Sequence, residues 1–414
     1  MPSFAIQNFG CRVNQAEAFS WAEELARGGL RPEGDPARAD FVVVNTCTLT
    51  AGADRDVRKF IRRVSRLNPS ARLVIAGCSV DGGAVRSEGL PIGALLLSNS
   101  DKAGLSGRVL SFVGARDERP VKPQRSRALL KVQDGCSLGC TFCIIPSVRG
   151  PSRSAGREET LARARRLISL GFWEIVLCGI HLSSYGLDRN PPDSLAGLLE
   201  DLVGLEGLGR LRLSSLDPRR LDDRLLGLIT GHPKICPHFH LSLQHASDRV
   251  LKLMGRGSTA AGYERTLARL RKRAPDAALG ADLIVGFPGE EDDDFGRLRD
   301  FVERSPLDYL HVFTYSPRPG TPAAGWAQVD EAEKRRRSAV LRAAGQVKRG
   351  SFRRRFLDRE LDAVVIRKGP RSAEVLTSNY IDVKVPAGSA EPGAAVRVRI
   401  TRLESGRAVG EEAG

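Results

Sequence analysis

The stretch Asp134-Gly-Cys-Ser-Leu-Gly-Cys-Thr-Phe-Cys-Ile-Ile-Pro146 holds Cys136, Cys140 and Cys143, directly after the apolar run 128–132. Three thiolates in a C-x3-C-x2-C spacing can bind three irons of one [4Fe–4S] cluster and leave the fourth iron open to a ligand. Zinc favours paired C-x2-C motifs with a second pair or histidines downstream, and none follows here at a fitting distance. The spacing therefore favours an iron–sulfur site over zinc binding or three buried cysteines.

Around this stretch, six apolar runs alternate with helix-like segments such as 157–170 and 262–274. Alternation of this kind predicts parallel strands joined by helices. Six units are too few to close an eight-stranded barrel, so we expect an open (β/α)6 partial barrel. The predicted strands are 128–132, 174–178, 210–214, 238–243, 280–286 and 310–314.

The N-terminal region predicts a separate open parallel α/β domain. Residues 3–9, 41–45 and 72–77 are apolar runs typical of strands. Between them, the helix predicted at 54–67 places Val57, Phe60, Ile61 and Val64 on one buried face and six Lys or Arg on the other.

A cysteine follows each of these three strands: Cys11, Cys47 and Cys78. The carboxyl ends of parallel strands meet at one edge of a sheet, where ligands bind. We therefore expect the three thiols to converge and to suit a second three-cysteine cluster, the alternative being three small apolar residues at strand ends. Cys178 and Cys236 have no partner spacing and are interpreted as structural.

The C-terminal region begins with a strongly basic run, 334–356, which has ten Lys or Arg and no acidic residue. Such a run is either a solvated helix or one that faces RNA, and the second is favoured. Short strands are predicted after it at 361–367, 372–376, 380–385 and 395–402, which indicates a small all-β barrel. Tyr380 either stacks on a base or belongs to the core. Residues from Ser405 are expected to lack structure.

The 414 residues suggest two or three domains, which we place at 1–120, 121–345 and 346–408, with a tail at 409–414. The polar stretch 101–124 is interpreted as a linker. A net charge of +15 favours a polyanionic partner, although an Arg-rich proteome would give the same excess. No apolar run long enough to span a membrane and no secretory signal is visible, and eight cysteines in so long a chain fit a reducing cytoplasm.

Together the cysteine motifs resemble the methylthiotransferase family of radical S-adenosylmethionine (SAM) enzymes. The resemblance rests on Cys136–Cys143 with Phe142, and on the stretches Asn8–Glu17, Val44–Thr50 and Ile75–Ser79. It implies two [4Fe–4S] clusters, one on Cys136, Cys140 and Cys143 with SAM, and the other on Cys11, Cys47 and Cys78. It also implies a radical SAM barrel followed by an RNA-binding TRAM barrel. Asn14 and Asn45 would lie beside the second cluster, or act as turn and capping residues.

The same resemblance implies the SAM contacts. They are Phe142, Gly179, Ser214, Gln244, Ile284 and Gly286, in stretches such as Leu177–Gly186 and Ala281–Glu291. Asp217 and Glu290 are further polar candidates. The chain departs from the family at His245-Ala246-Ser247, where Ser-Gly-Ser is usual, and at Gly255–Ser258, and both departures bear on fine specificity.

In the family, the cluster on the central motif and SAM generate a 5′-deoxyadenosyl radical that abstracts a substrate hydrogen, the second cluster holds the sulfur, and another SAM supplies the methyl group. The opening Gly10–Gln15, the stretch 143–154 and Ser378-Asn379-Tyr380 most resemble the branch acting on N6-threonylcarbamoyladenosine at position 37 of the tRNA anticodon loop. The alternatives are N6-isopentenyladenosine in tRNA, an aspartate in a ribosomal protein, or a non-catalytic iron–sulfur protein that binds nucleic acid. An electron donor such as a flavodoxin or ferredoxin is implied, and the sulfur donor is unknown.

Overall fold

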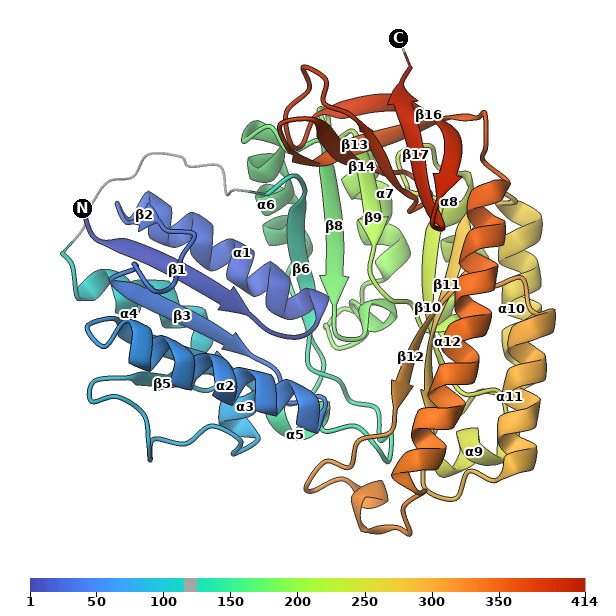
Figure 1. Cartoon of the computed structure of the whole chain (residues 1–414), viewed down its shortest axis with the longest axis horizontal. Coiled ribbons are helices and arrows are strands. Elements are labelled where there is room, and N and C mark those ends of the chain that lie inside the picture. Colours follow the sequence, from blue (N-terminus) through green and yellow to red (C-terminus); the bar gives the residue numbers. More distant parts are fainter. Residues whose placement is uncertain (115–124, 414) are drawn as a thin grey trace. The chain divides into compact units, whose positions relative to one another are not determined.

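A computed structural model describes residues 1–114 and 125–413 of the chain. These residues form two compact units (Figure 1). Unit 1 comprises residues 1–124, the loop 133–153 and the segment 316–324. Unit 2 comprises residues 125–132, 154–315 and 325–414. The cysteine loop that follows the first strand of the barrel therefore belongs to the same unit as the N-terminal region.

Unit 1 is built on a five-stranded parallel sheet in the order β2-β1-β3-β4-β5, drawn in blue in Figure 1. The predicted parallel α/β domain is confirmed. Its strands are β1 (Ser3–Asn8), β2 (Arg31–Pro32), β3 (Phe41–Thr46), β4 (Arg72–Gly77) and β5 (Leu95–Leu97). Its helices are α1 (Arg12–Arg27), α2 (Ala51–Leu67), α3 (Cys78–Asp81), α4 (Leu105–Ser111) and α5 (Ile145–Arg149).

Helices cover both faces of this sheet. Trp21 and Leu25 of α1 pack with Leu105 and Val109 of α4 against one face. On the other face, Val57, Ile61 and Val64 of α2 are buried as predicted, and Phe60 is half-buried. The prediction of a linker over 101–124 is wrong for its first part, because α4 buries Leu105 and Val109 in the core of the unit. Residues 115–124 lie outside the described residues.

Unit 2 contains the predicted open partial barrel. Strands β7-β6-β8-β9 form one sheet and β10-β11-β12 another, and the parallel bridges Leu211 to Ile235 and Leu216 to Leu241 join them. The strands are β6 (Ala128–Asp134), β7 (Arg153–Ser154), β8 (Glu174–Gly179), β9 (Arg210–Leu213), β10 (His238–Gln244), β11 (Ala278–Val285) and β12 (Tyr309–Thr314). The helices are α6 (Arg157–Ser169), α7 (Leu195–Val203), α8 (Asp223–Gly231), α9 (Asp248–Leu253), α10 (Ala260–Arg273), α11 (Asp292–Arg304) and α12 (Glu331–Arg354).

The C-terminal residues form the predicted small barrel, drawn in red in Figure 1. It is closed by five strands in the order β13-β14-β15-β17-β16. They are β13 (Glu360–Lys368), β14 (Ser372–Thr377), β15 (Asp382–Pro386), β16 (Ala395–Glu404) and β17 (Arg407–Glu412). The expectation that residues from Ser405 lack structure is wrong, because β17 pairs with both β15 and β16 and closes the barrel. None of the described helices is long and apolar enough to cross a membrane.

A buried ion cluster joins the small barrel to the partial barrel. Glu174, at the start of β8, accepts hydrogen bonds from Arg210 (2.6 Å) and Arg212 (2.9 Å) of β9. The two guanidinium groups in turn donate to the main chain of the small barrel, Arg210 to the carbonyl of Leu376 and Arg212 to that of Ser378. Burial raises the pKa of Glu174, but Arg212, Arg210 and Arg127 outweigh it and lower that pKa to about 2.

We expect Glu174→Gln to lower the free energy of unfolding by about 3 kcal/mol at pH 7, because it leaves two buried guanidinium groups without their carboxylate. Urea unfolding of the two proteins measures this difference. Since the folded pKa is depressed, the stabilisation is present above about pH 4.5 and is lost as the pH falls towards 2. The difference in the free energy of unfolding between the parent protein and Glu174→Gln should become smaller over that pH range.

Glu200→Gln is the matched control. Glu200 pairs with Arg224 at the surface, where removing one partner costs about 1 kcal/mol or less. Equal destabilisation by the two substitutions would contradict the role given to Glu174.

Candidate functional site

Three cysteines lie at the carboxyl edge of the unit 1 sheet, as predicted. Cys11 precedes the first residue of α1, Cys47 follows β3 directly, and Cys78 begins α3 directly after β4. Cys47 and Cys78 are buried, and Cys11 is half-buried. Strands β1, β3 and β4 are parallel neighbours, so the three cysteines lie at adjacent strand ends. Burial raises the pKa of Cys11 and Cys47, and Cys78 adds to both increases. This agrees with the expected convergence, and the role of the three thiols as cluster ligands stays a prediction.

Two glycines make this convergence possible. Gly10 has φ +99°, and a Cβ atom there would lie 2.7 Å from the Cys47 sulfur. Gly77 has φ +103° and turns the chain from β4 into Cys78. L-residues with side chains rarely adopt such angles, so both positions favour glycine. The space around the thiols is therefore kept open by the main chain.

Burial raises the pKa of the Cys47 thiol to about 12 and also raises that of Cys11, the latter against the opposing charge of Arg149. Both thiols are protonated at neutral pH in the absence of metal. Iron binding at these thiols would have to release their protons, and the metal would supply the compensating charge.

The loop with Cys136, Cys140 and Cys143 also belongs to unit 1. The main chain after residue 149 packs closely against its first turn. The amide of Cys136 donates to the carbonyl of Gly150. Gly135 approaches Pro151 so closely that a Cβ atom there would lie 2.0 Å from the Pro151 carbonyl oxygen. The amide of Cys143 donates to the carbonyl of Cys140. The three thiol-bearing residues are all half-buried, so a ligand can reach them.

Arg149 connects this loop to the N-terminal cysteines. It lies at the end of α5 and is 2% exposed, yet its guanidinium contacts three carboxylate or amide groups. It donates to Asn14 Oδ1 (2.5 Å), to Glu17 (3.1 Å) and to Asp134 (2.7 Å). Burial lowers the pKa of Arg149, but Glu17 and then Cys78 raise it well above its usual value. A permanent positive charge therefore lies beside the thiols.

Further buried polar contacts brace the same edge. Lys102 donates to Glu17 (2.6 Å), the partner of Arg149. Asn14 holds the loop of Cys11 by donating to the carbonyls of Phe9 (2.8 Å) and Thr46 (2.7 Å), and Asn45 donates to the carbonyl of Asn14 (2.8 Å). Asn14 lies within α1 and Asn45 within β3, so neither is a turn or capping residue. Their side chains instead bind main-chain carbonyls of neighbouring segments, and Asn14 also lies beside Cys11, whose sulfur is 3.6 Å from its Oδ1.

A second ion pair fixes the loop after Cys47. Arg318, from the segment 316–324, donates to Asp54 (2.5 Å) and to the hydroxyl of Thr48 (2.7 Å). Asp54 also accepts from Ser79, whose hydroxyl lies 2.8 Å from the carbonyl of Cys47. Both charged side chains are buried, so the loops of Cys47 and Cys78 are held by one network.

The residues at this edge fit a thiolate-bound iron–sulfur cluster. Three thiols converge around main chain without side chains, and a buried cation offsets the negative charge that thiolates and sulfides would bring. Among the described residues, Arg149 Nε is buried without a hydrogen-bond partner, as is Asn45 Oδ1. An orphaned N–H donor next to thiols suits a sulfur acceptor.

In unit 2, four of the predicted SAM contacts lie where the strands end. Gly179 closes β8, Ser214 follows β9, Gln244 closes β10 and Ile284 lies near the end of β11. All four are half-buried, and the Gly179 amide donates to the Ser214 hydroxyl at 3.4 Å. Gln244 has φ +73° at a register shift of β10, a strained conformation of the kind that collects at functional sites. These positions stay predictions as SAM contacts.

Gly286 has a structural explanation of its own, since a Cβ atom there would lie 2.3 Å from Lys334 Cγ. Phe142, the remaining predicted contact, is half-buried in the cysteine loop of unit 1.

The two acidic candidates are engaged inside the protein. Asp217 is buried and accepts from Arg219 (2.6 Å), with His181 Nε2 3.1 Å away. Glu290 is buried and accepts from Arg337 (2.9 Å). His245, at the departure from the family pattern, is fully buried, and its Nδ1 accepts from the amide of Ser247. Its side chain therefore does not line a surface. Cys178 and Cys236 are buried, in agreement with a structural role.

Tyr380 belongs to the packing between the small barrel and the partial barrel. Its ring stacks on His238 at 3.9 Å between centroids, and Arg212 lies over it. His238 therefore occupies one face of the Tyr380 ring, and the prediction that Tyr380 stacks on a base is wrong for that face.

Several of the ten basic residues of 334–356 are also paired internally, which weakens the prediction that the whole run faces RNA. Lys334 and Arg337 are buried and pair with Glu331 and Glu290, respectively, and Arg349 pairs with Asp382.

Sequence reasoning missed the charged network of the site: Arg149, Glu17, Lys102, Asp54 and Arg318. Glu17 carried the one available signal, because it is acidic and lies one turn after Asn14 on the buried side of α1.

Two family models match the chain. Residues 130–302 match the Radical SAM superfamily, and residues 3–86 match a model described as Uncharacterized protein family UPF0004. Among solved structures, the radical S-adenosylmethionine methyltransferase TsrM from Kitasatospora setae is similar in fold. The TM-score is 0.56 at 15% identity, over 78% of this chain and 77% of that one. The partial barrel and its cysteine loop thus define a radical SAM protein, a class that uses a [4Fe–4S] cluster and SAM.

Curated relatives cover nearly the whole chain. The threonylcarbamoyladenosine tRNA methylthiotransferase MtaB of Aquifex aeolicus is 36% identical over 96% of this chain and 99% of its own length. The tRNA-2-methylthio-N(6)-dimethylallyladenosine synthase of Dictyoglomus thermophilum is 32% identical, with 81% of each chain covered. The ribosomal protein uS12 methylthiotransferase RimO of an Anaeromyxobacter strain is 34% identical over 96% of this chain and 90% of its own length. The chain belongs to the radical SAM methylthiotransferase family, and it is an enzyme of that kind.

Proposed function

We propose that this enzyme converts N6-threonylcarbamoyladenosine at position 37 of the tRNA anticodon loop into its 2-methylthio derivative. This choice of substrate rests on the 36% identity with the Aquifex aeolicus enzyme over 99% of that enzyme's length. The branch motifs at Gly10–Gln15 and Ser378–Tyr380 support the same choice. A net charge of +15 supports a polyanionic substrate such as tRNA.

The chemistry requires that an aromatic C–H bond be exchanged for a C–S bond. Such a hydrogen is too weakly acidic for a protein side chain to remove as a proton. A reduced [4Fe–4S] cluster with SAM supplies a carbon-centred radical for this purpose. In this proposal Cys136, Cys140 and Cys143 hold that cluster, and the strand ends at Gly179, Ser214, Gln244 and Ile284 bind SAM.

We also propose a second [4Fe–4S] cluster on Cys11, Cys47 and Cys78. The convergence of three thiols at one sheet edge, the absence of side chains at Gly10 and Gly77, and the buried charge of Arg149 support it. With three protein ligands, one iron of each cluster stays open to a further ligand.

Nucleoside mass spectrometry tests the substrate. Reconstituted enzyme, SAM and a reductant are incubated without oxygen with two tRNA pools, one carrying threonylcarbamoyladenosine and the other isopentenyladenosine at position 37. We expect the first nucleoside to gain one SCH2 unit in mass and the second to stay unchanged. Methylthiolation of the second pool alone, or of ribosomal protein uS12 in a parallel reaction, would assign the chain to another branch of the family.

A further inference from the structure

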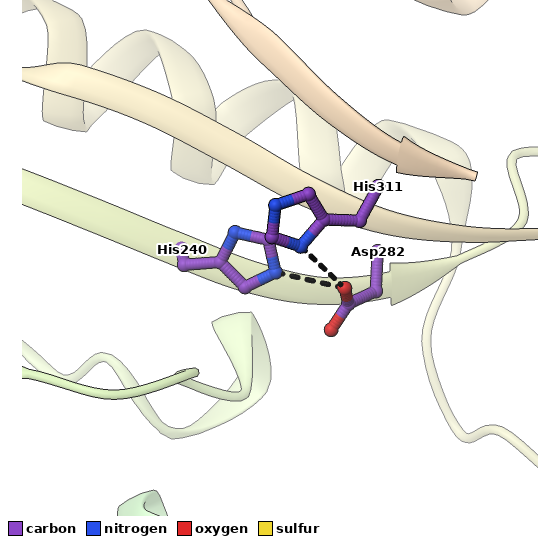
Figure 2. A group of neighbouring side chains, drawn as sticks. All are labelled: His240, Asp282 and His311. Carbon is purple, nitrogen blue, oxygen red and sulfur yellow. Dashed lines mark ion pairs between the residues drawn. The ribbon is translucent and has the colours of Figure 1, made fainter. Parts of the chain in front are cut away.

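Three side chains that the proposed function does not use form a compact group in unit 2. His240 of β10, Asp282 of β11 and His311 of β12 have ligand atoms that all lie within 4.8 Å of one another. His240 Nε2 is 2.9 Å from Asp282 Oδ1, and His311 Nδ1 is 3.4 Å from the same oxygen. Figure 2 shows both imidazole rings turned towards the carboxylate.

The sheet register explains why they meet. The three strands are parallel neighbours, with Asp282 directly paired to His311, and His240 paired to Gly280 two residues before Asp282. Side chains two residues apart on a strand point to the same face of a sheet, so all three project from one face. Asp282 is 22% exposed and His311 is 51% exposed, which leaves the group open to an ion from solvent.

A tyrosine orients His240. Tyr309 lies across Gly280, where a Cβ atom would be 2.0 Å from its ring. Its hydroxyl is 3.0 Å from His240 Nδ1 and 2.6 Å from His238 Nε2. The hydroxyl has one hydrogen, so one of the two histidines must donate to it. When Tyr309 donates to His238, His240 donates through Nδ1 and its Nε2 lone pair faces the carboxylate. Metal-binding histidines are oriented by this kind of bond from the second ring nitrogen.

We propose that His240 Nε2, an Asp282 carboxylate oxygen and His311 Nδ1 bind one divalent first-row transition metal ion. Two imidazoles and one carboxylate are a donor set that suits Zn²⁺, Fe²⁺ or Mn²⁺ and leaves positions for water or an oxygen ligand. Ligands at about 2.0–2.1 Å from a tetrahedral ion lie about 3.4 Å apart, and the two observed separations need only small movements to reach that value. All three proposed ligands belong to unit 2, and none of them is a cysteine.

Manganese binding to the whole chain tests the proposal. The protein is first loaded with its iron–sulfur clusters without oxygen, so that the cysteines are occupied, and is then titrated with Mn²⁺ followed by electron paramagnetic resonance. We expect one equivalent to bind and Zn²⁺ to displace it. His311→Ala should weaken binding at least tenfold. Because His311 is half exposed, this variant should keep its fold, which circular dichroism checks.

His232→Ala is the matched control, since His232 is also in unit 2 but lies outside the group and accepts a bond from the amide of Lys234. It should bind Mn²⁺ as the parent protein does. In pulsed experiments, nitrogen couplings from the two ligand imidazoles should be present in the parent and reduced in His311→Ala. No saturable binding of Mn²⁺ or Zn²⁺ below about 1 mM would overturn the proposal, as would equal binding by His311→Ala. His240 would then simply donate its Nε2–H to Asp282.

Discussion

Cys140→Ala is expected to abolish the release of 5′-deoxyadenosine when the reconstituted enzyme is reduced in the presence of SAM. The alanine removes one of the three proposed thiolate ligands in the loop after β6, and the remaining two would not complete the site of the cluster. The parent chain should contain about eight irons if both cysteine sets hold a four-iron cluster, and the variant about four. Iron analysis and chromatography of the reaction products measure the two quantities.

Cys47→Ala and Cys236→Ala distinguish the loss of one particular cluster from a general effect of removing a thiol. Cys47→Ala should also lower the iron content to about four but retain 5′-deoxyadenosine release, while methylthiolation is lost. Cys236 is buried in unit 2 and belongs to neither set, so its alanine variant controls for the loss of a thiol. It should keep the iron content, the 5′-deoxyadenosine release and the methylthiolation of the parent protein. A parent protein with only about four irons would contradict the second cluster, and release by Cys140→Ala would contradict the first.

The placement of the cysteines was predictable because it depends on local patterns. Apolar runs locate β1, β3 and β4 closely, and parallel topology then brings together whatever follows the strands. β17 escaped prediction because Arg407–Glu412 has polar and glycine residues among its apolar ones, and it becomes a strand only by pairing with two others. Likewise, α4 was not predicted because it contains Gly107, and its helical conformation is stabilised by tertiary packing.

The charged contacts of the site were not predictable from the sequence. Arg149 and Glu17 are 132 residues apart, and Arg318 and Asp54 are 264 apart. No periodicity relates such residues, because their pairing is decided by how distant segments pack. The same holds for His240, Asp282 and His311, which come together only through the register of three strands.

Arg149→Leu should therefore have a large effect although Arg149 is not a proposed ligand. The substitution removes the guanidinium that pairs with Glu17 and Asp134 and donates to Asn14, within a buried network. Breaking a buried pair of this kind costs about 3–5 kcal/mol, to be measured as the change in the free energy of urea unfolding. Arg63→Leu, on the exposed side of α2, is the control and should change that energy by about 0.5 kcal/mol or less.

A second consequence of Arg149→Leu separates an electrostatic role from simple stabilisation. The charge of Arg149 opposes the increase in the pKa of Cys11 that burial causes, so its loss should make the thiol harder to deprotonate. Assembly of the proposed cluster on Cys11, Cys47 and Cys78 needs deprotonated thiols, and the pH required for iron uptake should rise in the variant. Arg149→Lys keeps the positive charge but lacks the planar guanidinium with its several N–H donors. Compared with Arg149→Leu, it should restore part of the iron uptake at neutral pH. If both variants take up iron with the pH dependence of the parent, Arg149 supports the fold of unit 1 without tuning its thiols.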